Sequence, residues 1–74
     1  MIEALCKLIQ DNYKYLNISI GYTKITDWCI EVCERKGIGE DERIVYSESC
    51  DLTKAAADAY IKTVEWLCDN KGGY

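Results

Sequence analysis

The chain of 74 residues carries thirteen acidic and nine basic side chains, so its formal net charge at pH 7 is −4. That charge repels a phosphate backbone at long range, which argues against nucleic acid as a direct partner. With 49% hydrophobic residues and no proline, the composition predicts one folded domain over residues 1–74 and excludes a disordered chain.

The cysteines indicate the compartment. Their number, five, is odd, so a complete disulfide framework would leave one thiol over, and free thiols fit a reducing cytoplasm. The N-terminal apolar run is interrupted by Glu3, Lys7 and Asp11, which is not the pattern of a secretory signal. No apolar stretch approaches the roughly 20 residues that a membrane span needs. We therefore expect a cytoplasmic protein without membrane association.

The first predicted element is a helix from Ile2 to Asn12. Its apolar residues recur at the three- and four-residue spacing of one helix face, and they are Ile2, Leu5, Cys6, Leu8 and Ile9. A strand from Leu16 to Thr23 follows, because apolar and polar residues alternate there with a period of two.

Two further strands and a second helix complete the pattern. Period-two alternation predicts strands from Ile25 to Arg35 and from Arg43 to Ser49, separated by a glycine-containing loop over Lys36–Glu42. A helix capped by Asp51 then runs to an end between Asn70 and Gly73. Its predicted apolar stripe is Ala57, Tyr60, Ile61, Val64, Leu67 and Cys68.

This order predicts an α+β fold, α-β-β-β-α, in which three strands form an antiparallel meander and both helices cover one face. The covered face is expected to carry Leu16, Ile18, Ile20, Trp28, Ile30, Val32, Ile44 and Tyr46. The uncovered face is expected to carry Asn17, Ser19, Asp27, Cys29, Glu31, Cys33, Arg35, Arg43 and Ser47. That uncovered face is the larger place where a partner could bind.

The residues for metal binding or catalysis are missing from the pattern. Histidine is absent, and Cys29 and Cys33 would stand about 13 Å apart along a strand, so we expect no metal and no cofactor. Cys6 and Cys68 are expected to be small core residues. Without histidine, a cysteine or serine nucleophile lacks its usual base, so we expect no catalytic residues and no enzyme.

Acidic residues and one tryptophan are the candidates for partner binding. The predicted loop ends in Glu40-Asp41-Glu42, and Trp66 lies about 200° around the helix from Val64, away from the predicted stripe. An acidic surface can dock on a basic partner, and an exposed tryptophan can anchor an interface. The alternatives are a merely solvated loop and a tryptophan that closes over the core edge. The candidate partner-binding residues are Asp27, Glu31, Glu40, Asp41, Glu42, Glu48 and Trp66.

The element order resembles that of the double-stranded RNA-binding domain. Lys54-Ala55-Ala56-Ala57 is similar to the alanine-rich closing helix of that family. The resemblance implies a nucleic-acid-binding module as an alternative function. Where that family begins its last helix with clustered lysines, however, this chain has Asp51-Leu52-Thr53-Lys54, which removes the phosphate contacts.

A second resemblance is to small acidic anti-CRISPR proteins of phages, in particular the type II-A kind that blocks Cas9. It is carried by Ile25-Thr26-Asp27-Trp28-Cys29-Ile30-Glu31-Val32 and by Ile44-Val45-Tyr46-Ser47-Glu48-Ser49 before the second helix. The resemblance implies a non-enzymatic inhibitor, in a bacterial host cytoplasm, that imitates nucleic acid through Glu40, Asp41 and Glu42. Its partner would be a larger basic protein, a CRISPR effector or another protein. The exposed edges of the predicted sheet leave both a monomer and a homodimer open. The alternative is an adaptor with another partner.

Overall fold

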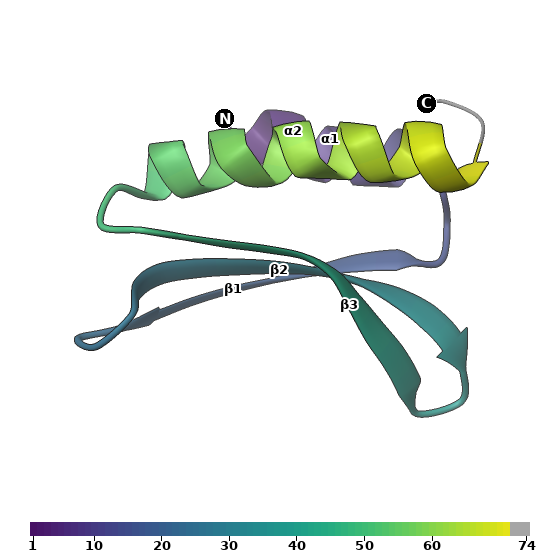
Figure 1. Ribbon diagram of the computed structural model, residues 1–74, viewed down its shortest axis with the longest axis horizontal. Helices are drawn as coiled ribbons and strands as arrows, with labels where there is room; N and C mark the ends of the chain where they lie inside the picture. The colour runs from purple at the N-terminus through teal and green to yellow at the C-terminus, as the bar shows by residue number, and fades with distance from the viewer. Residues whose placement is uncertain (72–74) are drawn as a thin grey trace.

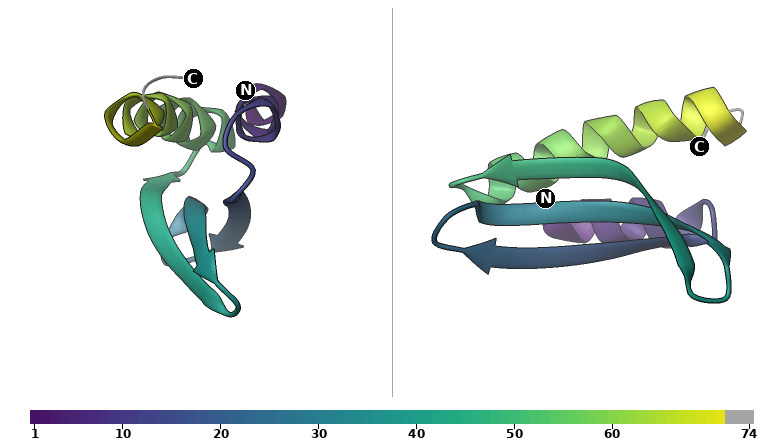
Figure 2. Two further views of the ribbon diagram at one scale, coloured as in Figure 1. Left: turned by 90° about the vertical axis from the view of Figure 1, so that its right-hand side faces the viewer. Right: turned by 60° about the horizontal axis from the view of Figure 1, so that its bottom comes forward.

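The computed structural model describes residues 1–71 and confirms the predicted order of elements. That order is α1 (Ile2–Asp11), β1 (Leu16–Thr23), β2 (Asp27–Gly37), β3 (Glu40–Ser49) and α2 (Leu52–Lys71). The strands form one antiparallel sheet in the order β1-β2-β3. Both helices lie in a single layer on one face of this sheet, and within residues 1–71 no element covers the opposite face (Figures 1 and 2).

Helix α1 buries the face predicted from its periodicity. Leu5, Leu8 and Ile9 are buried, while the charged side chains on the other side are exposed. Near the C-terminal end of the helix, Asn12 Nδ2 donates a hydrogen bond of 2.7 Å to the carbonyl oxygen of Leu8. This side chain satisfies one of the carbonyl groups that a helix end leaves without a partner.

Helix α2 starts at the predicted cap. Asp51 Oδ1 accepts a hydrogen bond of 2.8 Å from the backbone N–H of Thr53, which satisfies one of the first free amides of the helix. The helix continues through Lys71, and part of its predicted end, Gly72 and Gly73, lies outside the described residues. Over residues 1–71, neither helix combines the length and the apolar character that crossing a membrane requires.

The two hairpin turns differ from the predicted ones. The first turn spans 24–26, so Ile25 lies in the turn, 93% exposed, and does not begin a strand. The second turn is only Ile38-Gly39, where Gly39 has φ +73°, a conformation that favours glycine. The predicted loop over Lys36–Glu42 is therefore wrong. Most of it is paired strand, since Gly37 lies opposite Glu40 and the acidic run belongs to β3.

The side of β3 that faces the helices is the opposite of the predicted side. Val45 and Ser47 are buried, whereas Tyr46 lies on the uncovered side and Ile44 is half-buried. A register shift between Val32 and Cys33 leaves Ile44 as the extra residue of a β-bulge, and beyond it Val45 pairs with Val32. Ser47 is tolerated in the core because its hydroxyl donates a hydrogen bond of 2.8 Å to the carbonyl oxygen of Ala55.

The buried stripe of α2 is also rotated from the predicted one. Its buried residues are Ala55, Ala56, Ala59, Thr63 and Leu67. Ile61 and Cys68, both predicted to be buried, are exposed instead. Small alanines bring the helix axis close to the sheet, and the Thr63 hydroxyl donates to the carbonyl oxygen of Ala59 at 2.7 Å, so the polar atom is satisfied.

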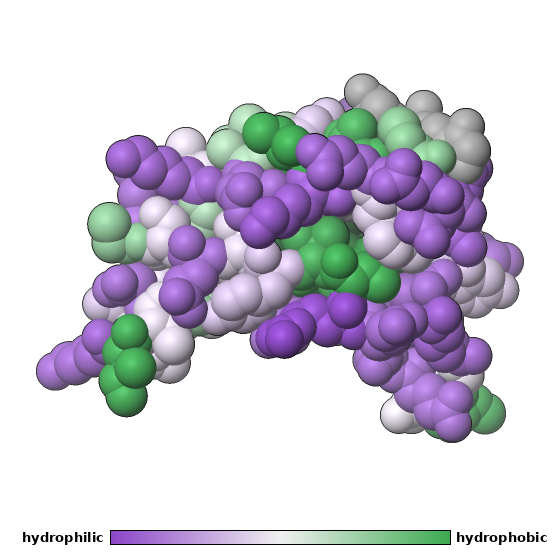
Figure 3. All heavy atoms as spheres, viewed as in Figure 1, coloured by the Kyte–Doolittle hydropathy of each residue, from purple (hydrophilic) through white to green (hydrophobic). Residues whose placement is uncertain are grey.

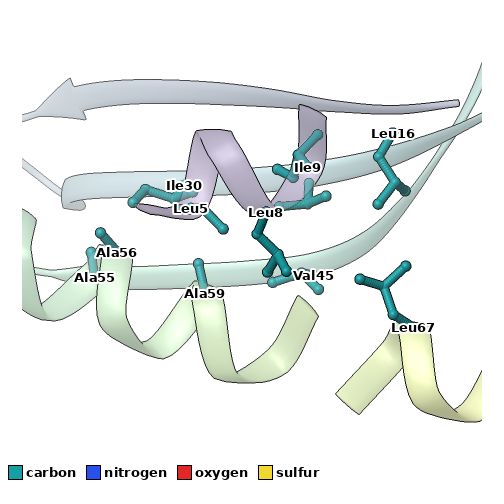
Figure 4. Packing of buried hydrophobic residues seen from close by; sticks show 11 residues of the cluster. Leu5, Leu8, Ile9, Leu16, Ile30, Val45, Ala55, Ala56, Ala59 and Leu67 are labelled. Carbon is teal, nitrogen blue, oxygen red and sulfur yellow. The ribbon is translucent and has the colours of Figure 1, made fainter. Parts of the chain in front are cut away.

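The core lies between the helix layer and the sheet (Figure 4). Side chains from every element converge there, and the eleven buried hydrophobic residues are Leu5, Leu8, Ile9, Leu16, Ile30, Val32, Val45, Ala55, Ala56, Ala59 and Leu67. Ile20, predicted for this face, is 42% exposed because it lies on β1 beyond the part that the helices cover. The core therefore leaves one end of the β1 row in contact with solvent.

Candidate functional site

The side of the sheet opposite α1 and α2 is a surface that these helices leave free. We call it the open face. It is defined by the side chains that alternate with the buried ones on each strand. They are Asn17, Ser19, Gly21 and Thr23 of β1, Asp27, Cys29, Glu31, Cys33 and Arg35 of β2, and Asp41, Arg43, Tyr46 and Glu48 of β3.

The open face brings together several of the predicted acidic residues. Glu48 lies opposite Cys29, and Glu31 lies opposite Tyr46, so the two glutamates are diagonal neighbours on adjacent strands. Asp27 lies at the turn end of this face and Asp41 at the other end. Among the ion pairs of residues 1–71, none involves any of these four carboxylates.

A tyrosine of β3, Tyr46, contacts three of its neighbours on the open face. Tyr46 Oη donates a hydrogen bond of 2.8 Å to Glu48 Oε2 and lies 3.4 Å from Cys29 Sγ. Hydrogen bonding to Cys29, then to Glu48, raises the pKa of the Tyr46 phenol far above its usual range. The Arg43 guanidinium stacks on the ring of Tyr46, 4.8 Å from its centroid. These contacts hold the phenol protonated and in one orientation.

The thiols of the open face are poor candidates for nucleophiles. Burial, followed by the negative charges of Glu31 and Asp41, raises the pKa of the Cys33 thiol, and these effects outweigh the opposite effect of Arg43. A thiol with a raised pKa is protonated at neutral pH and reacts slowly. Cys29 Sγ is 3.0 Å from Thr26 Oγ1, a contact within the first hairpin. The five cysteines are free thiols.

The acidic run Glu40-Asp41-Glu42 begins β3 and is exposed. Its three members do not act alike, because alternation places Asp41 on the open face and Glu42 on the other side. Glu42 Oε2 is 3.0 Å from Lys36 Nζ, so its charge is compensated locally. Only part of the predicted acidic loop is thus available to a partner as unpaired charge.

Trp66 lies in the helix layer, away from the acidic residues of the open face. It is half-buried, packs against the core, and has its ring 6.2 Å from that of Tyr13. Lys71 Nζ lies over both rings, 4.3 Å from the Tyr13 centroid and 5.6 Å from the Trp66 centroid. Trp66 and the open-face acids therefore cannot contact one flat partner surface together.

A buried carboxylate, Glu34, lies beside Tyr13 and Lys71 of this aromatic cluster and was not among the predicted site residues. It is 8% exposed and follows Ile30 and Val32 in the helix-facing row of β2. Lys36 Nζ is 3.3 Å from Glu34 Oε1, and Lys71 Nζ is 3.5 Å from Glu34 Oε2. Glu34 and Lys36 are two residues apart and therefore on the same side of a strand. This spacing was the feature of the sequence that could have predicted their ion pair.

An open groove of about 490 Å³ lies at this end of the molecule. Its lining residues are Tyr13, Tyr15, Glu34, Arg35, Lys36, Gly37 and Ile38. The charges of Lys36 and Lys71 are compensated by Glu34 and Glu42. We therefore interpret the groove as the junction of the β2–β3 hairpin with the helix layer, where two nearby lysines already have carboxylate partners.

The environment of Glu34 predicts an acid-sensitive stability. Burial raises the pKa of Glu34, but hydrogen bonding and charge from Lys36, with help from Tyr13 and Lys71, outweigh burial and lower it below the usual 4.5. The ionised form therefore stabilises the fold above pH 4.5, and this contribution is lost as the pH falls through the lower folded pKa. Urea unfolding should show that Glu34→Gln loses less stability between pH 7 and pH 3 than the native protein does.

Glu65→Gln is the matched control for this experiment, because Glu65 is exposed on α2 and, within residues 1–71, takes part in no ion pair. Its acid dependence should equal that of the native protein. Equal acid dependence of Glu34→Gln and the native protein would contradict the assigned role of Glu34.

Asp27 has a structural reason to be aspartate that is separate from binding. Its φ is +58°, the only positive value among the described non-glycine residues, and aspartate tolerates this conformation better than branched side chains do. Asp27→Val should lower the free energy of unfolding by about 1–2 kcal/mol, whereas Asp27→Asn should change it by less than about 0.5 kcal/mol. Thermal unfolding measures both, and equal losses would assign the effect to the charge instead of the backbone.

Over the described chain, no three side chains of histidine, cysteine, aspartate or glutamate are grouped so that they could hold a metal ion. Cys6 is half-buried and not among the buried core residues, and Cys68 is exposed, so the prediction that both are core residues is wrong. The rotation of the α2 stripe, which exposes Ile61, exposes Cys68 for the same reason.

Comparison with known proteins adds no relative. No protein-family model, curated protein or solved structure matches the chain. Its function must therefore be argued from its own residues.

Proposed function

We propose that the chain is a binding protein without catalytic activity, and that its open face binds a basic surface of a larger protein. The observation that carries this proposal is the pair Glu31 and Glu48, diagonal neighbours on β2 and β3 of a sheet face that neither α1 nor α2 covers. Neither carboxylate belongs to an ion pair of the described chain. Unpaired surface carboxylates of this kind speed association with basic partners and select among them.

The chemistry of the open face supports binding more than catalysis. Tyr46 and Cys33, its reactive groups with shifted pKa values, are both held in their protonated forms. A general base or a nucleophile needs the opposite shift. Rigid neighbours on two paired strands also suit a preformed binding surface, because little conformational entropy is lost when such a surface binds.

A narrower form of the proposal follows from the anti-CRISPR resemblance. In that form the partner is a nucleic-acid-handling defence protein of a bacterial host, and a Cas9–guide RNA complex is the first to test. The acids at the two ends of the open face, Asp27 and Asp41, would then extend the negative surface along the sheet. The protein would act by occupying a site that otherwise holds nucleic acid.

The test compares the double variant Glu31→Gln/Glu48→Gln with Glu65→Gln/Asp69→Asn, which removes the same charge from exposed positions of α2. Type II-A Cas9–guide RNA complexes are the defined probe, with binding and DNA cleavage measured over a salt series. The open-face variant should bind on the order of tenfold more weakly, with a flatter salt dependence, while the helix variant behaves like the native protein.

Three outcomes would count against the proposal in different ways. Absence of both Cas9 binding and inhibition would remove the narrower form. Equal recovery of every protein from a bacterial lysate by the native protein and the open-face variant, measured by quantitative mass spectrometry, would remove the general form. Micromolar binding of double-stranded RNA by the native protein, strengthened in the open-face variant, would establish the nucleic-acid-binding alternative instead.

A further inference from the structure

Strand β1 forms one edge of the sheet, and no other strand of the described residues pairs with its outer side. The strand order β1-β2-β3 makes β1 and β3 the two edges. Figure 2 shows in its right-hand view that neither helix covers the outer edge of β1. An uncovered edge offers a row of backbone donors and acceptors to another strand.

The hydrogen bonds to β2 identify which groups of β1 are free. The backbone N–H of Arg35 donates to the carbonyl oxygen of Tyr15 at 2.7 Å, so this pair is a hydrogen-bonded one. Bonded positions alternate along an antiparallel ladder, and the odd-numbered residues of β1 therefore bond to β2. The N–H and C=O groups of Ile18, Ile20 and Tyr22 are directed away from the sheet.

The side chains beside this free edge are apolar. Ile18, Ile20 and Tyr22 share one side of β1, and Ile20 and Tyr22 are 42% and 57% exposed. Tyr22 is held by Trp28, with ring centroids 5.1 Å apart. A short apolar row thus lies beside a row of unpaired backbone groups.

Charge distinguishes the two edges. Natural edge strands are usually protected from pairing by charged residues or proline. Strand β3 follows this rule, since it begins with Glu40-Asp41-Glu42-Arg43 and carries Glu48. Strand β1, Leu16-Asn17-Ile18-Ser19-Ile20-Gly21-Tyr22-Thr23, contains neither a charged residue nor proline.

We propose that two copies of the chain pair through β1 about a two-fold axis, so that their sheets join into one continuous antiparallel sheet. Placing Ile20 opposite Ile20 of the partner subunit sets Ile18 opposite Tyr22 of the partner subunit. The outward backbone groups then pair with one another and form about six hydrogen bonds. The same register gives a continuous apolar row on the side of the helices.

The occupant is a second copy because β1 is self-complementary and neutral in a protein of net charge −4. Pairing through β3 would bring the acids of two copies together, which costs energy. In the β1 register no charged residue of one strand lies opposite a charged residue of the other. This dimer does not depend on the proposed function, because it leaves the open face of both copies uncovered.

Sedimentation equilibrium and multi-angle light scattering test the dimer. The native protein should change from 8.5 kDa to twice that mass as its concentration rises into the high micromolar range. Ile20→Lys should remain a monomer, because two lysines would meet at the axis. Ile61→Lys, the same change at a 57% exposed position of α2, should dimerise like the native protein. Far-UV circular dichroism checks that both variants fold.

Amide hydrogen exchange on the native protein tests the pairing without relying on a variant. The amides of Ile18, Ile20 and Tyr22 should become protected as concentration rises, whereas those of Ser19 and Gly21, bonded to β2, should be protected throughout. A monomer at all concentrations, an undiminished dimer in Ile20→Lys, or unprotected even-numbered amides would each overturn the proposal. Growth beyond the dimer would overturn it too, since it would show β1 pairing with β3 of the next copy.

Discussion

Replacement of Leu5 by alanine should lower the free energy of unfolding by about 3 kcal/mol. Leu5 is fully buried on α1, in the cluster that joins this helix to α2 and the sheet (Figure 4). Truncation removes apolar contacts and leaves a cavity that a well-packed interior closes only in part. A domain of this size has a total stability of only about 4–11 kcal/mol, so the loss is a large fraction of it.

Urea unfolding followed by circular dichroism measures this loss. Ile25→Ala is the control, because Ile25 is 93% exposed at the first hairpin turn and its truncation should change the stability by less than about 0.5 kcal/mol. Exposed apolar side chains of this kind form the isolated hydrophobic areas visible at both hairpin ends in Figure 3. Similar losses in the two variants would contradict the position of Leu5 in the core.

The parts of the fold that could be predicted are those where large side chains define the period. In α1 the spacing of the leucines and isoleucines places them on a single helix face, and that face is buried in the structure. In β2, Trp28, Ile30 and Val32 alternate with polar residues, which fixed the side of Glu31 and Cys33 correctly. The element order followed from these patterns, although the turns were displaced by a few residues.

Strand β3 could not be predicted in the same way, because its face depends on register. Alternation from Ile44 and Tyr46 assigned Ser47 to the uncovered side, but the bulge at Ile44 lets Val45 pair with Val32. A bulge is decided by cross-strand pairing, which a single strand does not record. The same change of face brought Glu48 to the open face beside Glu31, so the juxtaposition of these two carboxylates was visible only in the structure.

The site residues show the same division. Glu31 was predicted from a strand with clear alternation, and the exposed acids of β3 from composition alone. Glu34 was not predicted as a site residue, because a carboxylate is not expected among the helix-facing side chains of a strand. It is tolerated there because two lysines and a tyrosine stabilise its ionised form. One of those lysines, Lys71, belongs to α2, far from Glu34 in sequence, so the network depends on tertiary packing.

Helix α2 gives the second large prediction, since its buried stripe is made of small residues. Ala59→Leu should lower the free energy of unfolding by about 2–3 kcal/mol, because Ala59 is fully buried where the helix approaches the sheet and the added atoms have no space. Leucine and alanine are both good helix formers, so helix propensity explains little of such a loss. Thermal and urea unfolding of the variant measure it.

The reciprocal variant, Ile61→Ala, separates the observed stripe from the one that the large side chains suggest. Ile61 is 57% exposed, so its truncation should change the stability by less than about 0.5 kcal/mol. If Ile61 were a core residue, the same truncation would cost about 2–5 kcal/mol, and Ala59→Leu would be tolerated on the surface. Ile61→Ala is the more stable variant if the observed face of α2 lies against the sheet, and Ala59→Leu is the more stable one if the predicted face does. The measured order of the two stabilities therefore identifies the buried face of the helix.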